Sequence, residues 1–163
     1  MPAFDLFPAR FELDHGTLTR MPPRNYPHAR LQHALATLLR ALLTAGGSPL
    51  VFTELVVRIG DDVVRIIDTA VFDEPGDEKH LVDGRLVRLA VAIADTTLIG
   101  DLGSKALDYA GAGIADYWVV DVAARVVHVH SKPTSDGYAT RTVAPFGQPM
   151  SAACLPEPVI FEG

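Results

Sequence analysis

The chain of 163 residues has little material for covalent stabilisation, because its single cysteine, Cys154, has no partner within the sequence. Its longest apolar run, residues 89–94, is far shorter than the roughly 20 residues that a helix needs to cross a bilayer. The first residues show no basic segment followed by an apolar stretch, as a secretory signal would. We therefore expect a cytoplasmic protein whose stability comes from a hydrophobic core.

Motifs of several large enzyme classes are also missing. The sequence has no glycine-rich phosphate loop, no Gly-x-Ser-x-Gly elbow and no Cys-x-x-Cys pair. These absences argue against P-loop nucleotide hydrolases, α/β-hydrolases and proteins with a paired-cysteine metal or redox site. Asp, Glu, His and Lys side chains are left as the candidates for chemistry.

Acidic residues outnumber basic ones, and the excess is concentrated in the middle of the chain. The net charge is −6, from 20 acidic and 14 basic residues. Residues 61–121 hold thirteen acidic and five basic side chains, a local net charge of −8. Such a block repels a polyanion unless a metal neutralises it. Four residues elsewhere supply most of the positive charge suited to phosphate contact: Arg20, Arg24, Arg30 and Arg40.

Hydrophobic patterning predicts one domain over residues 1–163, with 48% hydrophobic residues to fill its core. Helical spacing of leucines predicts a helix over 26–46, and a second helix is expected over 101–112 with Asp101 as its N-cap. Runs of Val, Ile and Leu predict the strands 50–58, 63–72, 86–94, 117–122, 125–131 and 138–143, and an N-terminal hairpin is expected over 11–21. The fold class is α/β or α+β, a sheet covered by helices, with an extra C-terminal hairpin.

Asp68 and Glu54 are two acids on largely apolar strand faces. Alternation along 63–72 places Asp68 in a row of apolar side chains, where a carboxylate needs a cation, a metal or a raised pKa. Glu54, one strand earlier, could meet it, and two adjacent carboxylates commonly share a proton or bind a hard divalent cation. The alternatives are a structural ion pair for Asp68 and simple solvation for Glu54.

Lys105 and a histidine pair are weaker candidates. Lys105 follows Asp101 by four residues, which predicts a surface ion pair within a helix. His128 and His130 share one strand face, a spacing that can support metal binding, but no third ligand stands at a recognisable spacing. An ordinary solvent-facing strand pair is the simpler interpretation.

Several segments together resemble the bacterial Uma-two family of "putative restriction endonucleases". They are residues 11–16 (FELDHG), 21–23 (MPP), His28 at the start of the first helix, 64–71 (VRIIDTAV), 101–105 (DLGSK) and 109–121 (YAGAGIADYWVVD). That family is similar in fold to the PD-(D/E)xK nucleases, whose core is a mixed sheet in the order αβββαβ. The resemblance implies a nuclease that acts on DNA with Mg²⁺ or Mn²⁺.

The resemblance also implies roles for particular residues. Asp68 matches the family's metal-binding aspartate, and Lys105 matches a lysine that supports the nucleophile or the developing charge. Glu12 and His28 match recurrent polar positions and are expected to be accessory.

Two positions depart from the family's pattern. Ile67 stands where the family has proline before the aspartate, and Ala92 stands where it has the third-strand glutamate that binds metal. Asp95, three residues after Ala92, is expected to point away from this face unless the strand has ended or bulged, so Glu54 is the better substitute ligand. We therefore expect weakened or lost cleavage.

A noncatalytic binding module on the same scaffold is the alternative to a weakened nuclease. In it, Asp68 would form a buried pair with Lys105 or Arg88. The chain could also form a homodimer.

Overall fold

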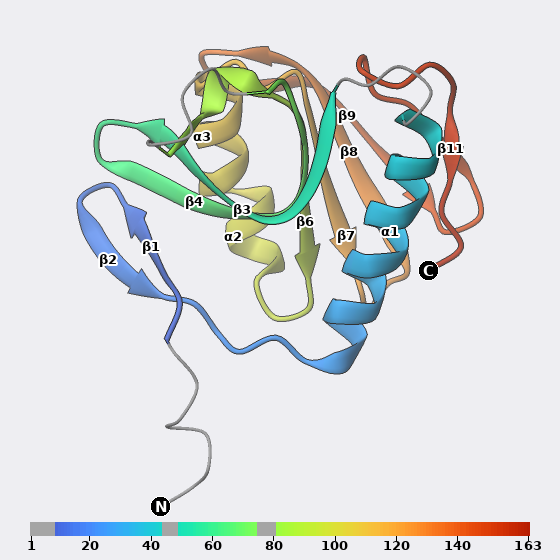
Figure 1. The fold of residues 1–163 in the computed structure, drawn as a ribbon, viewed down its shortest axis with the longest axis horizontal. Helices are drawn as coiled ribbons and strands as arrows, with labels where there is room; N and C mark the ends of the chain where they lie inside the picture. The colour runs from blue at the N-terminus through green and yellow to red at the C-terminus, as the bar shows by residue number, and fades with distance from the viewer. Residues whose placement is uncertain (1–8, 44–48, 75–80) are drawn as a thin grey trace, which may run out of the picture.

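The computed structural model describes residues 9–43, 49–74 and 81–163 (Figure 1). In chain order the elements are β1 (Phe11–Asp14), β2 (Thr17–Arg20), α1 (Tyr26–Leu43), β3 (Leu50–Gly60), β4 (Val63–Phe72), β5 (Val82–Asp83), a 3₁₀ turn (Gly84–Leu86), β6 (Val87–Ala94), α2 (Leu98–Leu102), α3 (Ser104–Gly111), β7 (Asp116–Asp121), β8 (Val126–Thr134), β9 (Gly137–Pro145), β10 (Pro149–Met150) and β11 (Val159–Ile160).

One large mixed sheet forms the centre of the fold. Its strands follow the order β2-β1-β4-β6-β7-β8-β9, and β3 pairs with β4 and with the short β5. Most pairs are antiparallel, but β6 and β7 run parallel. A parallel pair needs a crossover connection, which α2 and α3 supply. This crossover carries the 101–105 segment past the carboxyl end of β6.

Alternation along the central strands builds a core on each face of the sheet. On β6, one set of side chains packs in the cluster that contains α1, and the other packs in the cluster that contains α3. The first set is Leu89, Val91 and Ile93, and the second is Ala90, Ala92 and Ala94. Figure 1 shows the two helical layers on opposite sides of the sheet.

The predicted fold class is confirmed, including the order α1, β3, β4, β6, α2–α3, β7 and the C-terminal hairpin of β8 and β9. The first helix begins where predicted, because the Asn25 side chain accepts a hydrogen bond from the backbone N–H of His28 at 3.0 Å and so caps the helix. The predicted end of this helix, residues 44–46, lies outside the described residues. None of the described helices is long and apolar enough to span a membrane.

The second predicted helix is wrong in detail, because Gly103 divides it into α2 and α3. Asp101 is not an N-cap but lies inside α2, where its Oδ2 accepts a hydrogen bond from the Thr97 hydroxyl at 2.5 Å. A single glycine within a helical pattern does not reveal this break. Asp101 in α2 and Lys105 in α3 both face the cavity at the carboxyl end of β6.

We expect Gly103→Ala to destabilise the protein, since a Cβ at this position would lie 2.9 Å from the backbone oxygen of Ile99. Gly100→Ala is the matched control, because a Cβ there meets nothing within 4 Å. Gly100 lies inside α2, where alanine is favoured over glycine by about 0.5–1 kcal/mol. Thermal unfolding should show a lower Tm for Gly103→Ala only. An equal Tm for the two variants would contradict the close contact.

Candidate functional site

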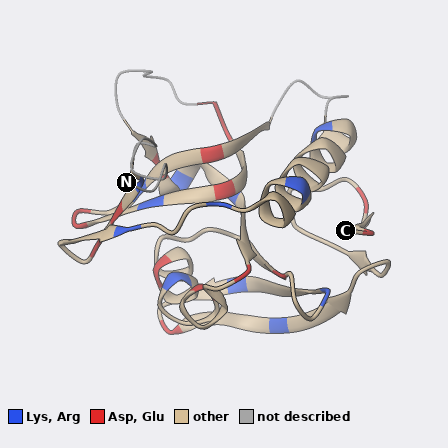
Figure 2. Cartoon of the chain, turned by 90° about the horizontal axis from the view of Figure 1, so that it is seen from below, with Lys and Arg blue, Asp and Glu red and all other residues tan. Residues whose placement is uncertain are grey.

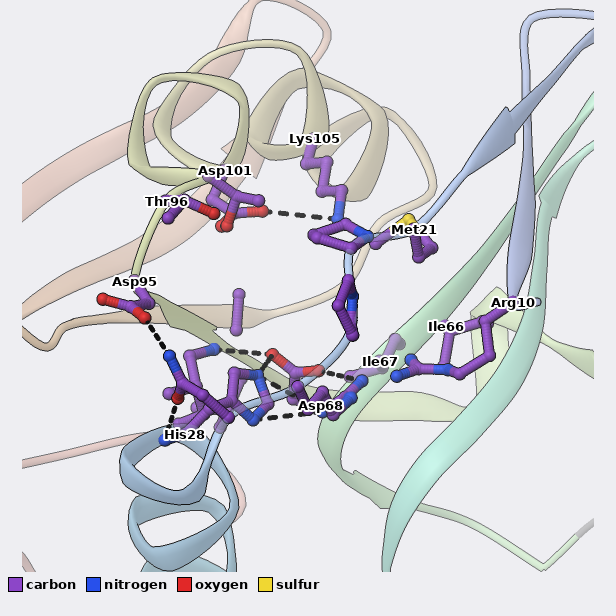
Figure 3. A pocket seen from close by; sticks show the side chains of 18 of the residues that line it. Arg10, Met21, His28, Ile66, Ile67, Asp68, Asp95, Thr96, Asp101 and Lys105 are labelled. Carbon is purple, nitrogen blue, oxygen red and sulfur yellow. Dashed lines mark hydrogen bonds and ion pairs between the residues drawn. The ribbon is translucent and has the colours of Figure 1, made fainter. Parts of the chain in front are cut away.

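A cavity of about 300 Å³ opens at the carboxyl end of β6. Its walls come from the segment between β2 and α1, from β4, from the turn after β6 and from the α2–α3 crossover. Figure 3 shows Asp68 and His28 on one side of this cavity and Asp101 and Lys105 on the other. A second hollow of about 470 Å³ adjoins it, lies against β1, β2 and α2, and shares Asp101 and Lys105 as lining residues.

Asp68 is held by three donors from three parts of the chain. Its Oδ1 pairs with Arg24 Nη2 at 2.5 Å, and its Oδ2 lies 3.3 Å from His28 Nε2. The same Oδ2 accepts a hydrogen bond from the backbone N–H of Ile93 at 2.7 Å. The side chain is 13% exposed, so both oxygens are largely shielded from water.

These contacts keep Asp68 ionised. Burial alone would raise the pKa of its carboxyl group, but the hydrogen bond with His28, the charge of Arg24 and the Ile93 N–H outweigh burial. The pKa of Asp68 therefore falls below its ordinary value of 3.8. The cavity contains a fixed anion that already has a cation beside it.

Arg24 also binds the second predicted acid. Its Nε lies 2.9 Å from Glu54 Oε1, and Arg10 Nε lies 3.7 Å from Glu54 Oε2. Continuing the β3–β4 register by one residue from Thr53 and Thr69 sets Glu54 opposite Asp68, as the alternation predicts. The structure thus brings both acids to one guanidinium, with Glu54 the more exposed of the two at 42%.

The predicted partners of Asp68 in the noncatalytic alternative, Lys105 and Arg88, are wrong. Arg88 is 55% exposed and pairs with Asp73 at 2.6 Å instead. The cation that pairs with Asp68 is Arg24, which the sequence analysis names only as a candidate phosphate contact. Its position four residues before His28 is the one local signal, because that spacing lets both reach one carboxylate.

Lys105 and Glu12 form a second buried ion-pair network. Lys105 Nζ lies 3.3 Å from Asp101 Oδ1, so the predicted ion pair between residues four apart is present. The pair is largely buried, however, and does not lie on the surface as predicted. Glu12 is 2% exposed, and its Oε2 lies 3.5 Å from Lys105 Nζ. Its Oε1 accepts the backbone N–H of Ile66 at 2.9 Å. Glu12 therefore joins β1, β4 and α3.

The pKa of Asp101 is shifted in the direction opposite to that of Asp68. Burial raises the pKa of the Asp101 carboxyl group, and the nearby charge of Lys105 and the Thr97 hydroxyl only partly offset that effect. The pKa values of the two carboxyl groups that line this cavity are thus shifted in opposite directions. Environments of this kind separate the protonation states of neighbouring acids.

Two further positions at the end of β6 complete the cavity wall. Ala92 lines the cavity, and continuing the β4–β6 register from Thr69 and Val91 by one residue sets its methyl group beside Asp68. Asp95 also lines the cavity, because β6 ends at Ala94, and its Oδ2 accepts a hydrogen bond from the Asn25 side chain at 2.5 Å. The strand has thus ended before Asp95, which is the condition under which the sequence allows Asp95 on the cavity side.

A family profile described as "Putative restriction endonuclease" matches residues 2–160. The chain belongs to the Uma2 family. The predicted family membership is confirmed, whereas the PD-(D/E)xK assignment and the loss of a glutamate at Ala92 stay predictions.

A solved structure is similar to this Uma2 chain. It is described as a "putative nuclease belonging to DUF820" from Anabaena variabilis, with a TM-score of 0.70, 16% sequence identity, and coverage of 91% of this chain and 86% of that one. The likeness supports a nuclease-like fold. The curated proteins include no sequence that matches the chain.

The donor set around Asp68 does not fit a divalent metal as it is arranged. Mg²⁺ requires six oxygen ligands at about 2.0–2.1 Å. Both oxygens of Asp68 are already taken by Arg24, His28 and a backbone N–H. Glu54 is paired with arginines, and a methyl group stands at position 92.

A second group of ligand atoms lies in the turn after β1 and on α3. Asp14, His15 and Asp108 offer atoms that all lie within 4.8 Å of one another. Arg65 Nη2 contacts Asp14 at 2.7 Å and Asp108 at 2.5 Å, so an arginine bridges these acids as well. The sequence does not reveal the group, because Asp108 lies more than 90 residues after Asp14 and His15 along the chain.

We expect Asp68→Asn to lower the free energy of unfolding by roughly 2 kcal/mol near neutral pH, since hydrogen bonds to a charged group are lost. Because folding lowers the pKa of Asp68, its contribution is complete above the ordinary value of 3.8 and disappears as the pH falls through the lower folded value. The stability difference between the two proteins should therefore shrink as the pH falls through the lowered pKa of Asp68 and vanish below it.

Chemical denaturation at a series of pH values measures this difference. Asp73→Asn is the matched control, because it removes an exposed Asp–Arg pair outside the cavity and should change stability little. A stability difference between wild type and Asp68→Asn that does not depend on pH would contradict the assigned anion.

Proposed function

We propose that this Uma2 protein is a nuclease of the PD-(D/E)xK type that acts on DNA phosphodiesters with strongly weakened cleavage. One observation carries the proposal: Asp68 and Lys105 line the same cavity, while Ala92 lies beside Asp68. The resemblance gives the first two residues catalytic roles and assigns the third position to a metal-binding glutamate. The site is therefore one carboxylate short.

Lys105 is the residue we assign to charge stabilisation. It lines both hollows, so a phosphate in either would lie near a cation. A fixed cation stabilises the negative charge that develops during attack on a phosphodiester. The buried acids Glu12 and Asp101 hold the Lys105 ammonium group in place by ion pairs.

Charge on the surface is consistent with modest DNA affinity. Of the four arginines expected at phosphates, Arg24 is paired inside the cavity, whereas Arg20, Arg30 and Arg40 are exposed. Arg40 also donates a hydrogen bond to the backbone oxygen of Val51. In Figure 2 acidic and basic segments lie intermixed on the strands. Binding should therefore depend only weakly on salt concentration, since few phosphate contacts release few counterions. A homodimer would add to this footprint and stays a prediction.

Nicking of supercoiled plasmid in Mn²⁺ and in Mg²⁺ tests the proposal. We expect Ala92→Glu to nick roughly 100-fold faster than wild type, the order of magnitude that one charge-stabilising group supplies. Adding Asp68→Asn to this variant should abolish the gain. The double variant purified in the same way is also the control for contaminating nucleases.

Two outcomes count against the proposal. Wild type that nicks as fast as Ala92→Glu would show that cleavage is not weakened. A folded Ala92→Glu protein that nicks no faster than its Asp68→Asn derivative would remove the nuclease assignment and leave a binding module on this scaffold.

A further inference from the structure

We propose that Arg24 is a built-in cation that occupies the place of a divalent metal between Asp68 and Glu54 and keeps metal out. The inference goes beyond the proposed function and rests on it only in one respect: it takes Asp68 as the position of the metal-binding carboxylate. It concerns what the site binds, whether or not DNA is cleaved.

The two acids need a cation between them. They stand opposite each other on the neighbouring strands β3 and β4, where two carboxylates repel. Arg24 contacts Asp68 at 2.5 Å through Nη2 and Glu54 at 2.9 Å through Nε. The Nε atom makes no hydrogen bond, so the contact with Glu54 is an ion pair, and it places one guanidinium charge beside both carboxylates.

The guanidinium is held in position by residues other than the acids. Arg24 Nη1 donates to the Oε1 of the buried Gln32 at 2.7 Å. The Gln32 side chain in turn donates to the backbone oxygen of Asp68 at 2.9 Å. Gln32 therefore fixes Arg24 and β4 relative to each other. These two hydrogen bonds indicate that the Arg24 side chain stays in the cavity.

Charge balance supports the same conclusion. Asp68 and Glu54 carry two negative charges, and Arg24 and Arg10 carry two positive charges within 4 Å of them. The group is neutral as it stands, so a divalent ion would bring an excess of two charges unless Arg24 left. Ala92 adds no acid that would favour such an exchange.

Removal of the guanidinium should therefore create a metal site. We expect Arg24→Met to bind Mn²⁺ at least tenfold more tightly than wild type, as measured by calorimetry and by electron paramagnetic resonance of free Mn²⁺. Without metal the variant should have a lower Tm, because two carboxylates lose their shared partner. Added Mn²⁺ should raise the Tm of Arg24→Met much more than that of wild type.

Two further variants make the test specific. Arg88→Met removes an arginine from an exposed Asp–Arg pair outside the cavity and should bind Mn²⁺ like wild type. Adding Asp68→Asn to Arg24→Met should abolish the gain in affinity. Arg24→Lys keeps the charge but cannot bridge two carboxylates in the same way, so its affinity should lie between those of wild type and Arg24→Met.

The proposal is overturned if wild type binds Mn²⁺ as tightly as Arg24→Met and loses that binding in Asp68→Asn. It is also overturned if folded Arg24→Met gains no affinity for Mn²⁺. If Arg24→Met does not fold, the comparison of Arg24→Lys with wild type decides the question. Plasmid nicking by Ala92→Glu is scored separately. Failure of that assay removes the nuclease assignment without changing the Mn²⁺ titrations.

Discussion

The anion of Asp68 is the constraint around which the cavity is organised. A buried carboxylate costs several kcal/mol, roughly, unless donors surround it, and here the donors come from the segment before α1, from α1 and from β6. The same contacts that neutralise the charge therefore join the start of the first helix to two central strands. Removing the anion would affect both the electrostatics of the site and the seating of the helix.

Three basic side chains each form ion pairs with two acids. Arg24 lies between Asp68 and Glu54, Arg65 lies between Asp14 and Asp108, and Lys105 lies between Glu12 and Asp101. Each cation comes from a different element than at least one of its acids. Three acids of the acidic 61–121 block, Asp68, Asp101 and Asp108, thus take part in cross-links between elements.

The resemblance to the family, and not periodicity, predicted that Asp68 and Lys105 belong to one site. Periodicity in the sequence was sufficient to predict the strands and the first helix, because alternation and helical spacing determine which face a side chain occupies. It could not predict Arg24 as the partner of Asp68. Arg24 stands in an irregular segment after two prolines, 44 residues before that acid, and no periodicity links the two. The break at Gly103 was missed for a similar reason, since it depends on one close backbone approach.

Glu12 has a mechanical consequence for the groove formed by the two hollows. The hairpin of β1 and β2 lies on one side of the second hollow and the α2–α3 crossover on the other, and Glu12 connects them through Lys105. Widening the groove would separate a buried carboxylate from its ammonium partner. The ion pair between Glu12 and Lys105 therefore opposes a widening of the groove.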